Sequence, residues 1–289
     1  MANIKEYKKK IKSIKGTLKI TSAMKLVAGA KLAKAQQAIN HAKPYDAQLQ
    51  DLVKTVLANC YDYNHPYMDV RDNRKALLLV ISSDRGLCGS YNSQLAREVV
   101  TFVRAHKEHD FEVHFVGKKV KAIIKDVVTM GETYQFSKGE PNVREIRQLA
   151  NTIGEIFETG KFGKVFVAYN VFKSAISFLP AVSQFLPVQI SAEECAALQK
   201  KGLVNFKYEP SAKEILDKLI PESYINRLYC SFLDAHAAEH GSRMTAMDNA
   251  SKNCKEAIRA KTLKMNKLRQ AKITTELIEV VSGAEALNN

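Results

Sequence analysis

Several features that define other protein classes are missing from this sequence. No run approaches the roughly 18 apolar residues of a membrane span. The opening residues, MANIKEYKKKIKSIKG, have no apolar signal core and lack the Arg/Ser bias of an organellar transit peptide. We therefore expect a cytosolic chain whose first residues already belong to the fold.

The cysteines exclude two further classes. They are odd in number and widely scattered, and no CxxC pair occurs. Neither a disulfide framework nor a thiolate zinc site is supported by such spacing, so we expect reduced, structural thiols. The five are Cys60, Cys88, Cys195, Cys230 and Cys254.

Proline is absent after Pro221, and Gly241 is the only glycine between that residue and Gly283. Because proline is favoured at the first helical position, we expect one helix over about 222–286. Its seam positions recur at 3,4 spacing, which is typical of a coiled coil. They are Met244, Met247, Ser251, Cys254, Ile258, Lys261, Met265, Leu268 and Lys272.

The N-terminal stretch to about Cys60 carries a matching pattern. Gly16 and Gly29 each cost about 1 kcal/mol in a helix, but the apolar spacing resumes after both, and Pro44 can kink the helix. At 1.5 Å per residue the two helices would reach roughly 80 Å and 98 Å. We expect them to pair as an antiparallel coiled coil. The N-terminal seam is Ile4, Tyr7, Ile11, Ile14, Leu18 and Thr21.

The central residues differ in kind. KALLLVIS reads as a buried strand, FEVHFVG and KVFVAYNVF as further strands, and ISFLPAVSQFLPV as a hairpin partner, with helices from about Asn92 and over 143–159. Strands alternating with helices predict an α/β domain of Rossmann-like type with a largely parallel sheet. The expected organisation is a coiled-coil helix over 1–60, the α/β domain over 75–190, a connecting loop with a short helical piece over 191–210, and a second coiled-coil helix over 211–289.

Positive charge is concentrated at the two ends of the chain. The formal net charge is +14. Residues 1–45 contain eleven lysines against Glu6, and residues 241–275 contain nine Lys/Arg against Asp248 and Glu256. Such segments favour an acidic partner, which can be nucleic acid, anionic lipid or an acidic protein surface.

Two short motifs resemble functional sites, one for phosphate and one for zinc. For each, we favour a structural interpretation over a functional one. DRGLCGS, between a strand and a helix, matches neither phosphate-loop pattern, so its glycines are expected to form a tight turn. HAAEH contains His236, Glu239 and His240 at the spacing of an inverted zinc-protease motif. A third ligand and a cleft would also be needed. A zinc hydrolase and a basic coiled-coil nucleic-acid binder remain as alternatives.

The C-terminal segment ITTELIEVVSGAEALNN is apolar on every side of a helix. A helix of that kind is normally enclosed by other protein, whereas a free terminus is usually polar and frayed. The sequence therefore predicts an apolar socket around the end of this chain. The apolar residues are Leu277, Ile278, Val280, Val281, Ala284, Ala286 and Leu287.

Three blocks in order carry a family resemblance: KITSAMKLVAGAKLAKAQ, SSDRGLCGSYN, and SRMTAMDNASKN followed by KLRQAKITTELIEVVSGAEAL. Together they resemble the gamma subunit family of the F-type ATP synthase, in its bacterial form, over essentially the whole chain. The resemblance implies a non-catalytic rotor shaft that couples proton-driven rotation of a c-ring to ATP synthesis in a ring of three alpha and three beta subunits. It implies no catalytic, cofactor or metal residues and no nucleic acid.

The same resemblance implies further partners and positions. The epsilon subunit and the c-ring would bind a foot region, and the chain would lie on the cytoplasmic side of the cell membrane without inserting into it. Expected contacts with the catalytic ring are Met24, Lys25, Arg243, Arg269, Gln270, Thr274, Glu276 and Glu279. The apolar bearing tip would be Ile278, Val280, Val281 and Leu287, and the foot contacts Tyr208 and Glu209 in KYEP.

Overall fold

The computed structural model describes residues 4–60, 63–136, 142–189 and 207–288, with side chains to Ala284. The chain divides into two compact units. One comprises Met1–Ala28 with Met244–Asn289, and the other comprises Gly29–Arg243. We call them the terminal unit and the sheet unit, and each is described by itself. Two long helices, α1 (Ile4–Ala58) and α6 (Ala212–Asn288), contribute residues to both.

A mixed sheet of five strands lies at the centre of the sheet unit, in the order β3-β2-β1-β4-β5. The first four strands run parallel, and β5 pairs antiparallel with β4. Their bounds are β1 Lys75–Ile81, β2 Asp110–Val116, β3 Thr129–Tyr134, β4 Lys164–Ser174 and β5 Ser177–Leu186.

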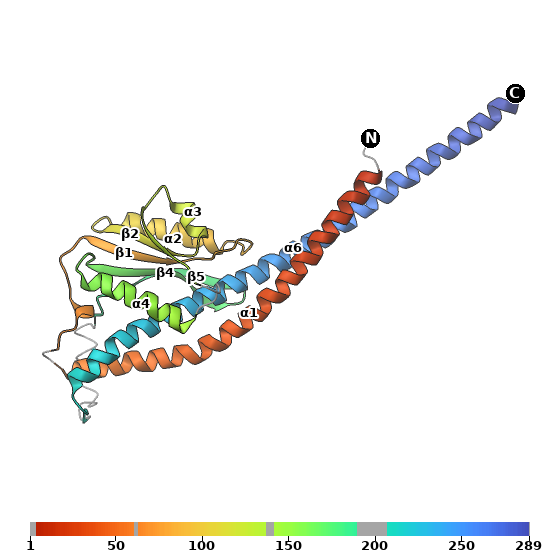
Figure 1. Ribbon diagram of the computed structural model, residues 1–289. Coiled ribbons are helices and arrows are strands. Elements are labelled where there is room, and N and C mark those ends of the chain that lie inside the picture. Colours follow the sequence, from red (N-terminus) through yellow and green to blue (C-terminus); the bar gives the residue numbers. More distant parts are fainter. Residues whose placement is uncertain (1–3, 61–62, 137–141, 190–206, 289) are drawn as a thin grey trace. The chain divides into compact units, whose positions relative to one another are not determined.

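Helices cover both faces of this sheet, as Figure 1 shows. Strand β1 has six consecutive buried residues because successive side chains point to opposite faces and both faces are covered. Leu78 and Val80 pack with α2 (Tyr91–Ala105) and α3 (Lys119–Ile124) on one face. Leu77 and Leu79 face α4 (Val143–Glu158) on the other.

The α4 face is completed by parts of α1 and α6, beside the short 3-10 helix η1 (Pro66–Met68). Val53 and Val56 of α1 and apolar residues of the first turns of α6 belong to the same core cluster. Helix α6 begins at Ala212, where the Ser211 hydroxyl accepts a hydrogen bond from the Glu214 amide (3.2 Å) and donates one to the Glu214 carboxylate (3.0 Å). Ser211 thereby acts as the N-cap and satisfies one of the backbone donors at the helix start.

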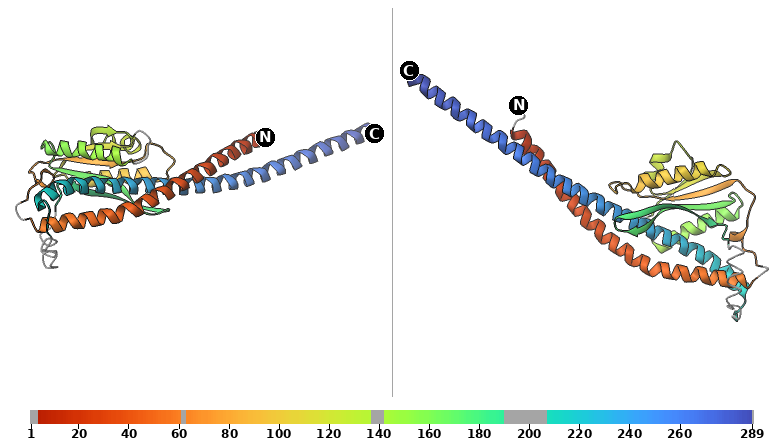
Figure 2. Two further views of the ribbon diagram at one scale, coloured as in Figure 1. Left: turned by 60° about the horizontal axis from the view of Figure 1, so that its bottom comes forward. Right: turned by 180° about the vertical axis from the view of Figure 1, so that it is seen from behind.

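In the terminal unit, α1 and α6 form an antiparallel coiled coil (Figure 2). The Ser251 hydroxyl donates to the Thr21 hydroxyl (2.8 Å), and Lys25 pairs with Asp248 (2.6 Å). The residue numbers rise along α1 as they fall along α6, so the two helices run antiparallel. Ile11, Thr21 and Met247 are buried along this seam. The spacing matches the knobs-into-holes packing of a coiled coil.

The prediction of long antiparallel helices with a largely parallel α/β domain is confirmed. Helix α1 runs through Gly16, Gly29 and Pro44 without a break. The prediction that Pro221 opens the C-terminal helix is wrong, because the helix starts at Ala212 after the N-cap Ser211 and Pro221 lies inside it. The sequence analysis did not predict strand β3 and helix α3. A short helical piece was predicted within 191–210, and residues 191–206 of that range lie outside the described residues.

Two helical glycines predict opposite effects of adding a methyl group. A Cβ at Gly154 in α4 would lie 1.9 Å from the Tyr67 hydroxyl oxygen, whereas a Cβ at Gly16 in α1 would meet nothing within 4 Å. We expect Gly154→Ala to lower the free energy of unfolding by about 1–3 kcal/mol through overpacking, and Gly16→Ala to raise it by about 0.5–1 kcal/mol. Urea denaturation of the full chain measures both, and shifts of the same sign would contradict the described packing.

Candidate functional site

The last part of α6 has no cover from within the described chain. Every described side chain from Arg269 to Ala284 is exposed. The apolar residues Leu277, Ile278, Val280 and Val281 are 60–69% exposed. Figure 2 shows α6 continuing past the N-terminal end of α1 in the terminal unit. A contiguous apolar surface of this kind marks an interaction site.

Three of the four residues expected at the bearing tip have described side chains on this exposed segment. Ile278, Val280 and Val281 are exposed to solvent in the isolated chain, so their side chains are accessible to a partner subunit. The side chain of Leu287 lies outside the described residues. The five expected contacts Arg269, Gln270, Thr274, Glu276 and Glu279 are on the same exposed segment. Among these five residues, Thr274 donates to the Gln270 carbonyl (3.0 Å), and Glu276 pairs with Lys272 (3.3 Å) within the helix.

A polar layer interrupts the apolar seam of the terminal unit. The Thr21 hydroxyl accepts from Ser251 and donates to the Leu18 carbonyl (3.2 Å), so this buried pair is satisfied. One turn further along α1, Asp248 accepts from Lys25 (2.6 Å) and from Lys252 (2.9 Å). Polar seam positions of this kind specify register at some cost in stability. Lys25, an expected contact with the catalytic ring, is therefore engaged inside the chain.

Lys25 and Lys252 also set the titration of Asp248. Hydrogen bonds from Lys25 first, and then from Lys252, lower the pKa of this carboxyl to about 2.

Met24, next to Lys25 on α1, is half-buried. Around it, Ile20, Leu26 and Val27 expose large apolar side chains on α1. This stretch of α1 thus offers an apolar surface beside a satisfied ion pair.

The two expected foot residues have different surroundings in the sheet unit. Tyr208 is half-buried against the core, and its hydroxyl accepts a hydrogen bond from the Asn59 amide (3.1 Å). Glu209 is exposed and pairs with Lys207 (2.6 Å). Tyr208 therefore serves the packing of its own unit, while Glu209 is open to a partner.

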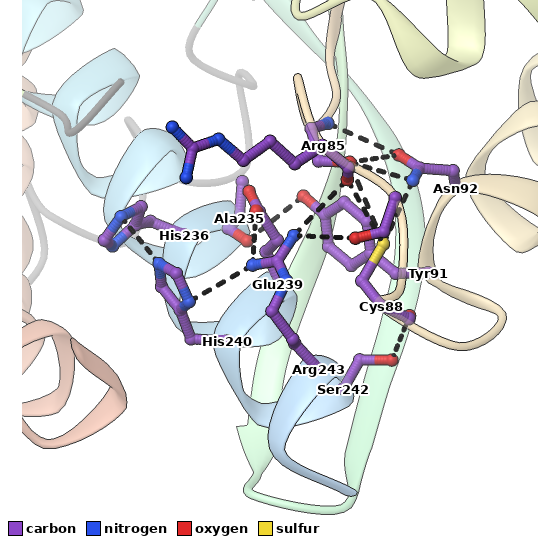
Figure 3. A network of polar contacts seen from close by, with 12 residues as sticks. Arg85, Cys88, Tyr91, Asn92, Ala235, His236, Glu239, His240, Ser242 and Arg243 are labelled. Atoms are coloured by element: carbon purple, nitrogen blue, oxygen red, sulfur yellow. Dashed lines mark hydrogen bonds and ion pairs between the residues drawn. The ribbon is translucent and has the colours of Figure 1, made fainter. Parts of the chain in front are cut away.

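A second polar site joins the DRGLCGS segment to α6 within the sheet unit (Figure 3). We call residues 82–90, which connect β1 to α2, the β1–α2 loop. The Arg243 guanidinium binds Glu239 at 2.7 Å and donates to the carbonyls of Arg85 (3.3 Å) and Gly86 (3.4 Å). The Ser242 hydroxyl donates to the Cys88 carbonyl at 2.6 Å. Loop and helix are thus bound through backbone oxygens.

Burial governs the ionisable groups of this site. It raises the pKa of Glu239, and the positive charge of Arg243 opposes that rise. It also raises the pKa of the Cys88 thiol, which lies within hydrogen-bonding distance of Asn92 (3.1 Å). A thiol with a raised pKa is a poor nucleophile, since the thiolate is the reactive form. Cys88 is therefore a structural group, as the sequence predicted for all the cysteines.

The two histidines of HAAEH contact each other. Their Nε2 atoms are 3.1 Å apart, and the Nδ1 atom of His240 is 3.3 Å from Arg243. Because a guanidinium can only donate, that Nδ1 accepts, and His240 carries its proton on Nε2, toward His236. A metal would need this Nε2 lone pair. No group of three or more His, Cys, Asp or Glu side chains suited to a metal occurs among the described residues.

Comparison with known proteins identifies the family. The family described as ATP synthase matches residues 3–287. The ATP synthase gamma chain of Geotalea daltonii is 38% identical over 292 residues, covering 99% of both chains. That of Flavobacterium johnsoniae is 36% identical over 289 residues, covering 100% of both. The chain belongs to the ATP synthase gamma-chain family.

Solved structures agree with that assignment. A chain of the Tetrahymena thermophila mitochondrial ATP synthase, in a structure of its central stalk and c-ring, is 25% identical with a TM-score of 0.58. The match covers 80% of this chain and 99% of that one. A chain of the Euglena gracilis mitochondrial ATP synthase has a TM-score of 0.66 at 21% identity, covering 98% and 94%, which shows the shared fold. A gamma chain is a non-catalytic rotor subunit of the ATP synthase complex.

Sequence reasoning on this gamma-chain sequence missed how its motifs are used. Arg243 was expected to contact the catalytic ring, but its guanidinium is turned into its own chain. Glu239 lies in a stretch that matches the spacing of a metal motif, and it is the ion-pair partner of Arg243. The i,i+4 spacing of Glu239 and Arg243 is a signal that could have found this pair. The carbonyl acceptors in the loop have no sequence signal.

The lowered pKa of Asp248 predicts a pH-dependent contribution to stability. A carboxyl whose pKa is lower in the folded state stabilises it above its ordinary pKa of 3.8, and this stabilisation is lost as the pH falls toward about 2. We expect Asp248→Asn to be less stable than the natural chain above pH 4 and equal to it near pH 2. Thermal unfolding measured across this range tests it, with exposed Asp51→Asn as the control. A constant difference down to pH 2 would contradict the described pairing.

Proposed function

We propose that this chain is the shaft that couples proton-driven rotation of a c-ring to conformational change and ATP synthesis in a ring of three alpha and three beta subunits. The observation that carries the proposal is a full-length match to ATP synthase gamma chains combined with an apolar helix end that the described chain leaves uncovered. The epsilon subunit and the c-ring are proposed as the remaining partners, with Glu209 as a candidate contact at the foot.

The apolar tip is proposed to turn inside a hydrophobic sleeve at the top of the alpha/beta ring. Apolar contact is non-directional, so its free energy varies little as the shaft rotates. At about 100° per residue, Leu277, Ile278, Val280 and Val281 span roughly 160° around α6, so they present one broad apolar face to the sleeve. A ring of directional hydrogen bonds would instead hold the shaft at preferred angles.

Coupling is proposed to arise from the asymmetry of the shaft. A partner shifts a conformational equilibrium only by its different affinities for the two states, so three identical beta subunits must meet different faces of this chain. The apolar residues around Met24 and the exposed positions from Arg269 to Glu279 are candidate contacts. Exposed ion pairs of about 0–1 kcal/mol with acidic loops break easily at each step, which suits a rotating contact.

The proposed location is the cytoplasmic face of the cell membrane, reached through the c-ring. In the part of the chain that the structure describes, no helix is long and apolar enough to span a bilayer. Peripheral attachment through partner subunits accounts for membrane association without an inserted segment.

A basic coiled coil that binds nucleic acid is the alternative function. The lysines of the first turns of α1 favour it, because they are exposed and could follow a phosphate backbone. They are Lys5, Lys8, Lys9, Lys10, Lys12, Lys15 and Lys19. This alternative predicts duplex binding with a steep dependence on salt, whereas the shaft should show no sequence preference and no binding at physiological salt.

Co-expression with the alpha and beta subunits tests the function directly. We expect size-exclusion chromatography to recover one copy of the chain in an ATP-hydrolysing complex with three copies of each of the other subunits. Recovery of the alpha/beta ring without this chain, under conditions where the chain is soluble, would reject the shaft.

Met24→Lys should impair coupling. The family resemblance implies that Met24 lies opposite an acidic loop of a beta subunit, and the new ammonium group would add an ion pair to that loop. A pair worth up to about 1 kcal/mol that must break at each step would slow that step up to about fivefold. We expect fewer protons pumped per ATP hydrolysed in membrane vesicles, with Met24→Leu behaving as the natural chain. Equal pumping ratios for the two variants would count against this contact.

Val281→Asp separates the tip's role in assembly from its role in folding. Because Val281 is exposed in the chain, the substitution should change the chain's own stability by less than about 0.5 kcal/mol. Loss of about 1.5–3 kcal/mol of apolar burial should weaken association with the alpha/beta ring about tenfold or more. Exposed Asn253→Asp in the same helix is the matched control. Undiminished association of Val281→Asp would argue against a sleeve around the tip.

A further inference from the structure

Hydrogen bonds from α6 add to those that the β1–α2 loop makes locally, where the Arg85 carbonyl also accepts from Ser83 and the Cys88 carbonyl from the Tyr91 amide. A loop leaves backbone carbonyls without the partners that a helix or sheet would supply. Three of them, at Arg85, Gly86 and Cys88, accept hydrogen bonds from Arg243 and Ser242. The side chain of Arg243 is only 9% exposed because these carbonyls and Glu239 enclose it.

The loop is also held in an unusual conformation. Leu87 is a non-glycine residue with φ of 62°, in the left-handed region that such residues rarely adopt. Its side chain is 64% exposed, so burial of that side chain does not explain the conformation. Strained backbone persists where surrounding contacts determine it, and it gathers at functional segments. Here the carbonyls of Gly86 and Cys88, on either side of Leu87, both accept hydrogen bonds from α6.

We propose that Arg243 is a positioning residue, which with Ser242 fixes the β1–α2 loop on α6 and acts on coupling through that loop. This inference rests on the proposed shaft function. The outward groups of the loop are Arg85 and Leu87, both exposed. In Figure 3 the Arg85 side chain extends away from the network, while that of Arg243 points into it. Arg243 thus determines the positions of the exposed side chains of Arg85 and Leu87.

The inner side of the loop is anchored independently of Arg243. Asn92 at the start of α2 donates to the Ser83 hydroxyl (2.8 Å), and Ser83 donates to the Arg85 carbonyl (2.8 Å). The Tyr91 hydroxyl donates to the Ala235 carbonyl of α6 (3.1 Å). Loss of the Arg243 contacts should therefore loosen the loop locally while β1 and α2 keep their places. Local loosening is a result that a purely global stabilising role would not produce.

Two variants release the loop in different ways. Arg243→Lys keeps a positive charge beside Glu239, but one ammonium group cannot also reach the two loop carbonyls as a planar guanidinium does. Ser242→Ala removes the hydrogen bond to Cys88 and leaves Arg243 untouched. Because it alters no charge, Ser242→Ala remains informative if Arg243→Lys fails to fold. Arg97→Lys, at an exposed position on α2, is the matched control.

Hydrogen–deuterium exchange of the full chain measures the loop. Loss of one hydrogen bond should favour local opening of the loop by about tenfold. Exchange of the amides at 84–91 should therefore be about tenfold faster in either variant. Exchange in β1 should stay unchanged, as should all exchange in Arg97→Lys. Unchanged exchange at 84–91 in both variants would overturn the inference.

Proton pumping per ATP hydrolysed, in the complete assembly, measures the consequence. We expect both Arg243→Lys and Ser242→Ala to lower the number of protons pumped per ATP. The variant whose loop exchanges faster should show the larger decrease. Reduced pumping in Arg243→Lys with a loop as protected as in the natural chain would show direct contact by Arg243 and overturn the inference. Normal pumping with a loosened loop would overturn it as well. If the natural chain joins no alpha/beta complex, the shaft function itself fails, and the exchange result alone decides whether Arg243 fixes the loop.

Discussion

The antiparallel packing of α1 against α6 is the contact on which the other features depend. In the terminal unit it buries Ile11, Thr21 and Met247 along one seam. In the sheet unit the same two helices bring Val53 and Leu216 to the core under the sheet. Because α6 continues beyond α1 in the terminal unit, its last turns have no partner in the described chain. Their apolar side chains therefore require one from outside.

Polar groups along these helices divide into two kinds that suit a moving part. Some have partners within their own unit: the Thr21–Ser251 pair and Asp248 with its two lysines in the terminal unit, and Arg243 with Glu239 in the sheet unit. Others are exposed and can form and break contacts as partners pass. A rigid shaft with weak, exchangeable surface contacts can impose different states on identical neighbours without being trapped by any of them.

The helices, their seam and the uncovered tip could be predicted from sequence because each depends on a local repeat. Apolar residues at 3,4 spacing identify the seam, and consecutive apolar residues in KALLLVI identify the central strand. Strand β3, with Gly131 and few apolar residues, carries no such pattern and forms at the sheet edge through pairing with β2. The bridge from Arg243 to the β1–α2 loop was missed because its acceptors are backbone carbonyls 157 and 158 residues away, and any residue type provides those.

Hydroxyl-radical footprinting of residues 277–281 tests the central claim most directly. It compares the solvent exposure of the natural α6 tip in the chain alone and in the assembly with alpha and beta subunits. Enclosure of an apolar tip predicts strong oxidation of Leu277, Ile278, Val280 and Val281 in the free chain and a several-fold loss of oxidation in the assembly. Equal oxidation in both would mean that the tip stays in water, and it would contradict the account of this helix as a shaft held in a socket.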